Sequence, residues 1–202
     1  MQPTTVNVLL LIAGFLAALA LTTLVHESGH LAAARLLRIP VWRIVIGMGP
    51  VFSRSALNDD SEFVLRAIPT GMLIGVPGRR NPDGMQRRPI HHDVLIAAAG
   101  PMMSLLLAVF LRGAAQLRVL PISLRFWLEC TAMLSAFLGL SNLIPIPGLD
   151  GGHLLLLGAA RLGLQFSPEG EMQAHRVGVC LVTVACLVAL VATLVLRFLG
   201  LL

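Results

Sequence analysis

The stretch VNVLLLIAGFLAALALTTLVHESGH, residues 6–30, joins an apolar run to a cluster of ionisable side chains. Up to Val25 the run carries no charged residue, and its length suffices to cross the roughly 30 Å of hydrocarbon in a bilayer. His26, Glu27 and His30 follow directly. Because residues four apart share one face of a helix, the two imidazoles can each turn one nitrogen toward a single metal ion. The stretch therefore predicts a membrane-spanning helix that ends in a metal site.

The order His-Glu-x-x-His is the arrangement of zinc hydrolases, in which two histidines hold the ion and the glutamate takes the proton of the attacking water. We therefore expect one zinc ion per chain, held by His26 and His30, with Glu27 as the catalytic base. The same residues also fit a buried polar cluster, or a proton or ion relay in a membrane protein. The spacing of one motif does not separate these possibilities.

The composition is that of an integral membrane protein. The 202 residues are 56% hydrophobic and 12% charged, and the mean hydropathy of +0.86 exceeds that of an ordinary soluble domain. The net charge of +5 comes from 15 arginines and no lysine, a balance that can indicate nucleic-acid binding. Nine of these arginines, however, lie from Arg35 to Arg88, between two apolar runs, where basic residues fix membrane orientation. The chain also has no tyrosine for base stacking. We therefore expect a lipid bilayer as the partner and no nucleic acid.

The expected fold class is an α-helical polytopic membrane protein with about four transmembrane helices. Four apolar runs are long enough, or nearly so, to cross the bilayer: residues 6–25, 94–111, 122–143 and 177–196. The first leads into a polar motif and not a small-residue cleavage site, which favours a retained span over a signal peptide. The arginine-rich loop is expected on the cytoplasmic side and both termini outside. At the outer end of the third run, Arg125 and Glu129 are four apart and are expected to form an ion pair.

Between the first two spans, the pattern changes to short stretches rich in β-branched residues and punctuated by glycine and proline. Residues 41–76 are predicted to form a small β-sheet with a turn at 58–61. Residues 77–92 are a basic connector, which either lies against anionic head groups or is a solvated orientation signal.

A second motif, NLIPIPGLDGGH at residues 142–153, contains two prolines and three glycines and is not expected to form an unbroken helix. Broken helices at membrane depth are tolerated only inside protein or beside a water-filled cavity. A catalytic zinc site takes three protein ligands plus water, and Asp150 can be the third. Because the first and third spans both run inward, Asp150 should reach the same side and depth as His26 and His30. His153 is expected to play a supporting or structural role.

Taken together, these residues resemble the site-2 proteases, a family of intramembrane zinc metalloproteases. HESGH matches the family's HExxH motif, and residues 142–152 match its asparagine- and proline-rich LDG motif with the aspartate ligand. Three further segments are similar to the family's membrane-associated β-region and second core helix: residues 47–50, 66–71 and 99–101. The resemblance covers most of the chain. It implies a single intramembrane metalloprotease core over residues 1–202, in a minimal form without a PDZ or CBS domain.

The resemblance also implies a reaction, namely hydrolysis of peptide bonds within or near transmembrane segments, as in regulated intramembrane proteolysis. Asn142 is expected either to hydrogen-bond the substrate backbone or to cap the broken helix. An anti-sigma factor, a remnant signal peptide or a developmental pro-factor would fit as substrate. The implied location is the inner or plasma membrane, with the active site near the cytoplasmic face. The alternative from another class is a metal-binding membrane protein without protease activity, either a transporter or a scaffold.

Two positions depart from the family pattern. Ser104 stands where many members have asparagine, and Met72 stands where a second glycine is common. Neither is expected to touch a proposed metal ligand, so both departures are expected to affect substrate positioning more than the chemistry.

Overall fold

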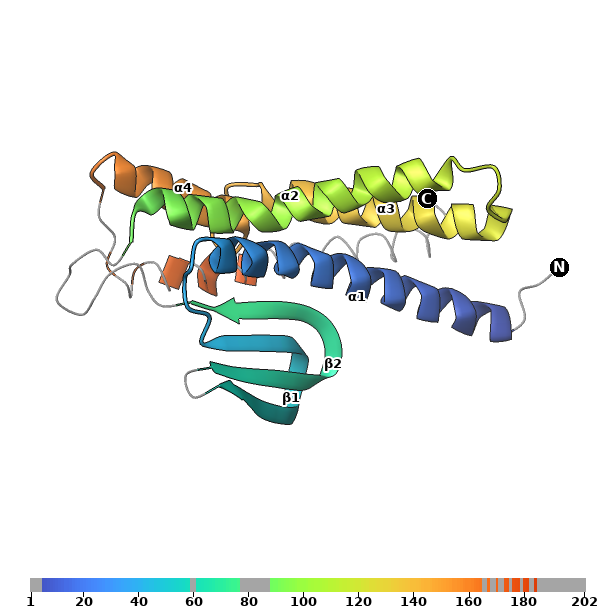
Figure 1. Cartoon of the computed structure of the whole chain (residues 1–202), viewed down its shortest axis with the longest axis horizontal. Helices are drawn as coiled ribbons and strands as arrows, with labels where there is room; N and C mark the ends of the chain where they lie inside the picture. The colour runs from blue at the N-terminus through green and yellow to red at the C-terminus, as the bar shows by residue number, and fades with distance from the viewer. Residues whose placement is uncertain are drawn as a thin grey trace. The chain divides into compact units, whose positions relative to one another are not determined.

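The fold is given by a computed structural model, which describes residues 5–58, 61–76 and 88–164, together with single positions and short runs between 167 and 184. The chain divides into two compact units, residues 1–142 and 143–202. The first unit contains, in chain order, α1 (Thr5–Leu36), β1 (Arg43–Asn58), β2 (Ser61–Gly75), α2 (Ile90–Ala115) and α3 (Ile122–Asn142) (Figure 1). The second unit contains α4 (Asp150–Arg161).

Three described helices, α1, α2 and α3, are long and apolar enough to cross a membrane. They confirm the polytopic helical class and correspond to the first three expected spans. The fourth expected span, residues 177–196, lies mostly outside the described residues.

The length of α1 determines where the histidine motif lies. Its 32 residues rise about 48 Å at 1.5 Å per residue, which exceeds the hydrocarbon thickness. His26 lies about 32 Å along this rise, so the motif falls near one border of the apolar layer. The helix ends just before Pro40, where the backbone of Arg38 adopts a positive φ of 57° and Ile39 N donates to Ala34 O. Proline disfavours helical backbone in the residue before it, so Pro40 in the sequence predicts this end.

The helices α1, α2 and α3 pack against one another through small residues (Figure 1). A Cβ added to Gly29 of α1 would overlap the carbonyl of Ala99 and lie 2.7 Å from Cγ of Met103, both on α2. A Cβ at Gly139 of α3 would lie 3.0 Å from the carbonyl oxygen of Pro101 on α2. Glycine at these points lets two helix backbones approach closely, as is common in membrane bundles.

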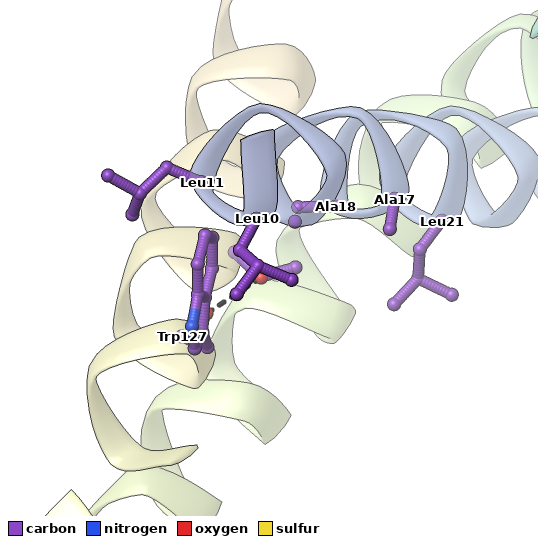
Figure 2. Close-up of a pocket in the computed structure, with 8 residues that line it drawn as sticks. Leu10, Leu11, Ala17, Ala18, Leu21 and Trp127 are labelled. Atoms are coloured by element: carbon purple, nitrogen blue, oxygen red, sulfur yellow. Dashed lines mark hydrogen bonds between the residues drawn. The ribbon is translucent and has the colours of Figure 1, made fainter. Parts of the chain in front are cut away.

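At the other end of α1, the indole of Trp127 on α3 reaches toward α1 beside Leu10 (Figure 2). The two helices border an open apolar groove of about 740 Å³. Its lining residues carry no ionisable side chain: Leu10, Leu11, Gly14, Ala17, Ala18, Leu21, Trp127 and Thr131.

The β-region forms a small sheet in which both strands fold back on themselves. The pairs Asn58↔Ser61 and Ser53↔Leu65 belong to a hairpin, which confirms the expected pairing around the turn. The start of β1 pairs with the end of β2, from Arg43↔Gly75 to Ile46↔Met72. The same four residues of β1 also pair with the beginning of β2, from Arg43↔Glu62 to Ile46↔Leu65. The fold-back follows Gly47 and Gly49, whose φ values of 94° and 83° favour glycine.

The expected ion pair between Arg125 and Glu129 is wrong. Glu129 accepts instead from Arg112 Nη1 at 2.9 Å and from Gln116 Nε2 at 3.0 Å. The guanidinium of Arg125 donates to the carbonyl of Ala115 at 2.8 Å. Carbonyls in the last turn of α2 lack intrahelical donors. The guanidinium of Arg125 supplies one of these donors from α3, and it does so instead of forming the weak i,i+4 pair with Glu129.

Candidate metal centre

The two histidines of HESGH lie side by side on one face of α1. Their ring centroids are 5.1 Å apart and the ring planes are inclined by 79°. His26 is buried, with 4% of its surface exposed, and His30 is half-buried. The four-residue spacing therefore does bring the imidazoles together, as the sequence predicts.

Each imidazole is oriented by a contact from α2. His26 Nδ1 lies 2.9 Å from the hydroxyl oxygen of Ser104, and His30 Nδ1 lies 2.7 Å from the carbonyl oxygen of Ile96. A carbonyl oxygen only accepts, so His30 must carry its proton on Nδ1 and present the lone pair of Nε2. Metal-binding histidines generally use the non-coordinating ring nitrogen in this way.

The Nε2 atoms of both rings converge on one point next to Gly100 of α2. A Cβ at this glycine would overlap Nε2 of His30 and lie 2.8 Å from Nε2 of His26. The absence of a side chain at position 100 thus keeps open the space that the two ligand atoms face. Imidazole nitrogens bind zinc at about 2.0–2.1 Å, and a histidine pair with engaged Nδ1 atoms fits this ion.

The orienting residues share one face of α2, because Ile96, Gly100 and Ser104 are spaced four apart. Helices α1 and α2 run in opposite directions here, so Ser104 lies beside His26 and Ile96 beside His30. One side of α2 thereby supplies a contact to each ring and the open space for their Nε2 atoms.

The expectation that Ser104 touches no proposed ligand is wrong, since its hydroxyl contacts His26 directly. A departure from a family pattern carries no information about which face of a helix the residue occupies. The four-residue spacing from Gly100 could have indicated that Ser104 belongs to the same helix face.

Glu27 is half-buried and follows His26 on α1. Its place in the motif is the one predicted, and its role as a base remains a prediction.

Asp150 lies in the second unit as the first residue of α4, after Leu149 at the N-cap. Gly151 and Gly152 are buried there: a Cβ on either would overlap main-chain carbonyls between residues 143 and 146. The helix break predicted from the prolines and glycines is confirmed, because α3 ends at residue 142 and α4 begins at Asp150. A carboxylate in the first turn also complements the helix dipole.

His153 is exposed on α4.

Asn142 is the last residue of α3, and its Nδ2 donates to Leu138 O at 2.9 Å. This contact lies within α3, and the helix-capping alternative remains a prediction. A contact between Asn142 and a substrate remains a prediction.

A unit of long apolar helices in which two histidines turn their Nε2 atoms toward one point defines a class, namely a polytopic membrane protein with a candidate metal site. The chain belongs to peptidase family M50, whose family model matches residues 14–119 and 113–185.

Curated relatives match about half of the chain. A protein of Nostoc sp. named as a zinc metalloprotease is 34% identical over 104 residues, covering 48% of this chain and 28% of the relative. A protein of Synechocystis sp. named in the same way is 35% identical over 101 residues, covering 46% and 27%. The chloroplastic membrane metalloprotease ARASP of Arabidopsis thaliana is 32% identical over 102 residues, covering 46% and 22%. The chain thus spans about a quarter of the length of these relatives.

The site-2 protease from Methanocaldococcus jannaschii has a similar fold, with a TM-score of 0.57. The match covers 90% of this chain and 69% of that chain at 21% sequence identity.

Proposed function

We propose that this protein is an intramembrane zinc metallopeptidase, which hydrolyses peptide bonds within or near the transmembrane segments of other proteins. The observation that carries the proposal is the convergence of two histidine Nε2 atoms beside Gly100 of α2. Both histidines lie on α1, the helix that also bears Glu27. Membership of a peptidase family supports hydrolysis as the reaction. The names of the relatives support zinc as the metal.

We propose Asp150 as the third protein ligand. Two imidazoles leave a catalytic zinc site one ligand short, and a carboxylate completes the set while keeping a position open for water. The helix break before Asp150 supports this role, because irregular backbone at membrane depth belongs inside protein or beside water. When bound, zinc acts as a Lewis acid that activates water and polarises a carbonyl at neutral pH.

The proposed role of Glu27 is proton transfer. Its carboxylate accepts a proton from the attacking water and passes it to the nitrogen of the leaving amine. His26 and His30 hold their positions through the Nδ1 contacts to α2 and transfer no proton.

The proposed substrates are membrane proteins with a transmembrane segment that can unwind locally. An anti-sigma factor, a remnant signal peptide and a pro-factor all fit this description. Asn142 is a candidate for contacting the unwound backbone. The arginine distribution supports insertion in an inner or plasma membrane with the histidine motif near the cytoplasmic face.

The test compares the purified protein with Glu27→Gln in detergent and in liposomes. The variant should bind as much zinc as the wild type and lose cleavage of a transmembrane reporter peptide. Zinc is measured by elemental analysis and cleavage by mass spectrometry of the fragments. Unchanged cleavage by Glu27→Gln would contradict the proposed mechanism.

A metal-binding transporter or scaffold is the other outcome of this test. It predicts no cleavage by either protein, and a transporter would also move zinc into sealed vesicles. Zinc uptake without proteolysis would therefore replace the proposed function.

A further inference from the structure

The side chain of Ser104 occupies a fully buried position between three helices. Its residue has 0% of its surface exposed, and its hydroxyl oxygen lies 2.9 Å from Nδ1 of His26. The partner ring is itself 4% exposed. A polar contact this deeply buried is shielded from competition by water, so it constrains the ring more firmly than a surface contact would.

Helix α3 also holds Ser104 in place. The hydroxyl of Ser135 donates to the main-chain carbonyl of Ser104 at 2.8 Å, and Ser135 is also 0% exposed. The Cβ of Ser104 lies 3.0 Å from the point where a Cβ on Gly139 would be. Tight packing and a main-chain hydrogen bond therefore fix the position from which the Ser104 hydroxyl contacts His26.

Two other buried hydroxyls of the bundle, those of Thr22 and Thr131, are used differently. Thr22 donates to Leu19 O at 3.0 Å and Thr131 donates to Trp127 O at 2.7 Å, in both cases within their own helix. Such contacts satisfy a polar group locally and link nothing across the bundle. The hydroxyl of Ser104 instead contacts an imidazole on another helix.

We propose that Ser104 is a positioning residue for metal binding, which orients His26 by accepting a hydrogen bond from its Nδ1–H. The contact selects the tautomer with a lone pair on Nε2 and directs this atom toward the space beside Gly100. The inference rests on the proposed function, because it requires His26 to be a metal ligand. It assigns a role to the serine that stands in place of the family's common asparagine.

The experiment measures the apparent zinc affinity of the purified protein by competition with a chromophoric chelator. Ser104→Ala removes the hydroxyl and should weaken zinc binding by about 10- to 100-fold, the usual effect of losing a group that orients a metal ligand. Thr22→Val is the matched control, because it removes a buried hydroxyl one turn before His26 while keeping the side-chain shape. It should bind zinc with wild-type affinity.

A second readout separates orientation from packing. In the cobalt-substituted protein, Ser104→Ala should alter the visible absorption bands, which report ligand geometry, whereas Thr22→Val should leave them unchanged. Ser104→Cys keeps the shape of the side chain but replaces the hydroxyl with a larger thiol, which is a weaker acceptor. It should weaken zinc binding less than Ser104→Ala, and it decides the question if the alanine variant does not fold.

Wild-type zinc affinity in Ser104→Ala or Ser104→Cys would overturn the inference, as would equal losses in Ser104→Ala and Thr22→Val. Failure of the proposed function has a different signature. In that case the wild-type protein would bind no zinc, or His26→Ala would bind zinc as well as the wild type does.

Discussion

The Nδ1 atom of His30 lies 2.7 Å from the carbonyl oxygen of Ile96, eight residues before the serine that contacts His26. The carbonyl and the hydroxyl belong to one face of α2, with Gly100 midway between them. The geometry of the two candidate ligands is thus determined as much by α2 as by the motif that contains them. Substitutions on α2 should therefore alter metal binding.

Gly100→Ala should abolish or strongly reduce zinc binding, because the new methyl group would occupy the space that both Nε2 atoms face. We expect zinc occupancy to fall by at least about tenfold, as for other disruptions of a metal site. Elemental analysis of the purified variant measures this directly.

Gly113→Ala is the control in the same helix. Nothing lies within 4 Å of a Cβ added at this position, and alanine favours the helix by up to about 1 kcal/mol over glycine. This variant should keep its zinc and melt at or slightly above the wild-type temperature. Equal zinc occupancy in both variants would show that the space beside Gly100 is not the metal site.

Asp150→Asn should lower zinc occupancy, since an amide is a poorer zinc ligand than a carboxylate. His153→Ala should leave occupancy near the wild-type value, because His153 is exposed on α4 and is not among the proposed ligands. Elemental analysis of both variants after dialysis against the same free zinc concentration tests the assignment. A larger loss in His153→Ala than in Asp150→Asn would mean that the ligand set is wrong.

Asp93→Asn should destabilise the protein far more than Glu129→Gln. Asp93 pairs with Arg88 at 2.6 Å, and the two side chains are only 6% and 12% exposed. Removing one partner of a buried pair typically costs about 3–5 kcal/mol because the other charge stays buried. Glu129 pairs with Arg112, whose side chain is 68% exposed, and such pairs contribute about 1 kcal/mol or less. Thermal unfolding in detergent should show a clearly larger drop in melting temperature for Asp93→Asn. Equal drops in the two variants would contradict the view that the buried pair stabilises the fold more than the exposed pair does.

Cysteine labelling in intact cells tests the proposed orientation. In a background without the native cysteines, a cysteine replacing Arg118 should react with a membrane-impermeant maleimide, because the link between α2 and α3 is expected outside. A cysteine replacing Arg80 should react only after the cells are opened. Labelling of position 80 in intact cells would reverse the orientation.

Much of the first unit was predictable, because its helices are specified by local pattern. Apolar runs of sufficient length predict α1 to α3, and Pro40 predicts the end of α1. The helix break before Asp150 follows from prolines and glycines, which disfavour helix wherever they occur. The His26–His30 pairing follows from helical periodicity alone.

The contacts between helices were not predictable in the same way. Which residue of α2 lies beside His26 depends on the register of α1 against α2, and the two backbones approach closely at Gly29. The same reason explains the mistaken Arg125–Glu129 pair, since the better partners lie on a neighbouring helix. The α4 helix was not predicted as a separate element, because its start falls within the glycines of the second motif.

The two imidazoles differ in whether a substitution on α2 can remove the group that orients them. His30 is held by a main-chain carbonyl, which every amino acid at position 96 would provide. His26 is held by a side-chain hydroxyl, which a single codon change at position 104 can remove or replace. On the proposed role of Ser104, sequence drift can therefore adjust the zinc affinity of the candidate centre through His26 while the contact to His30 stays constant.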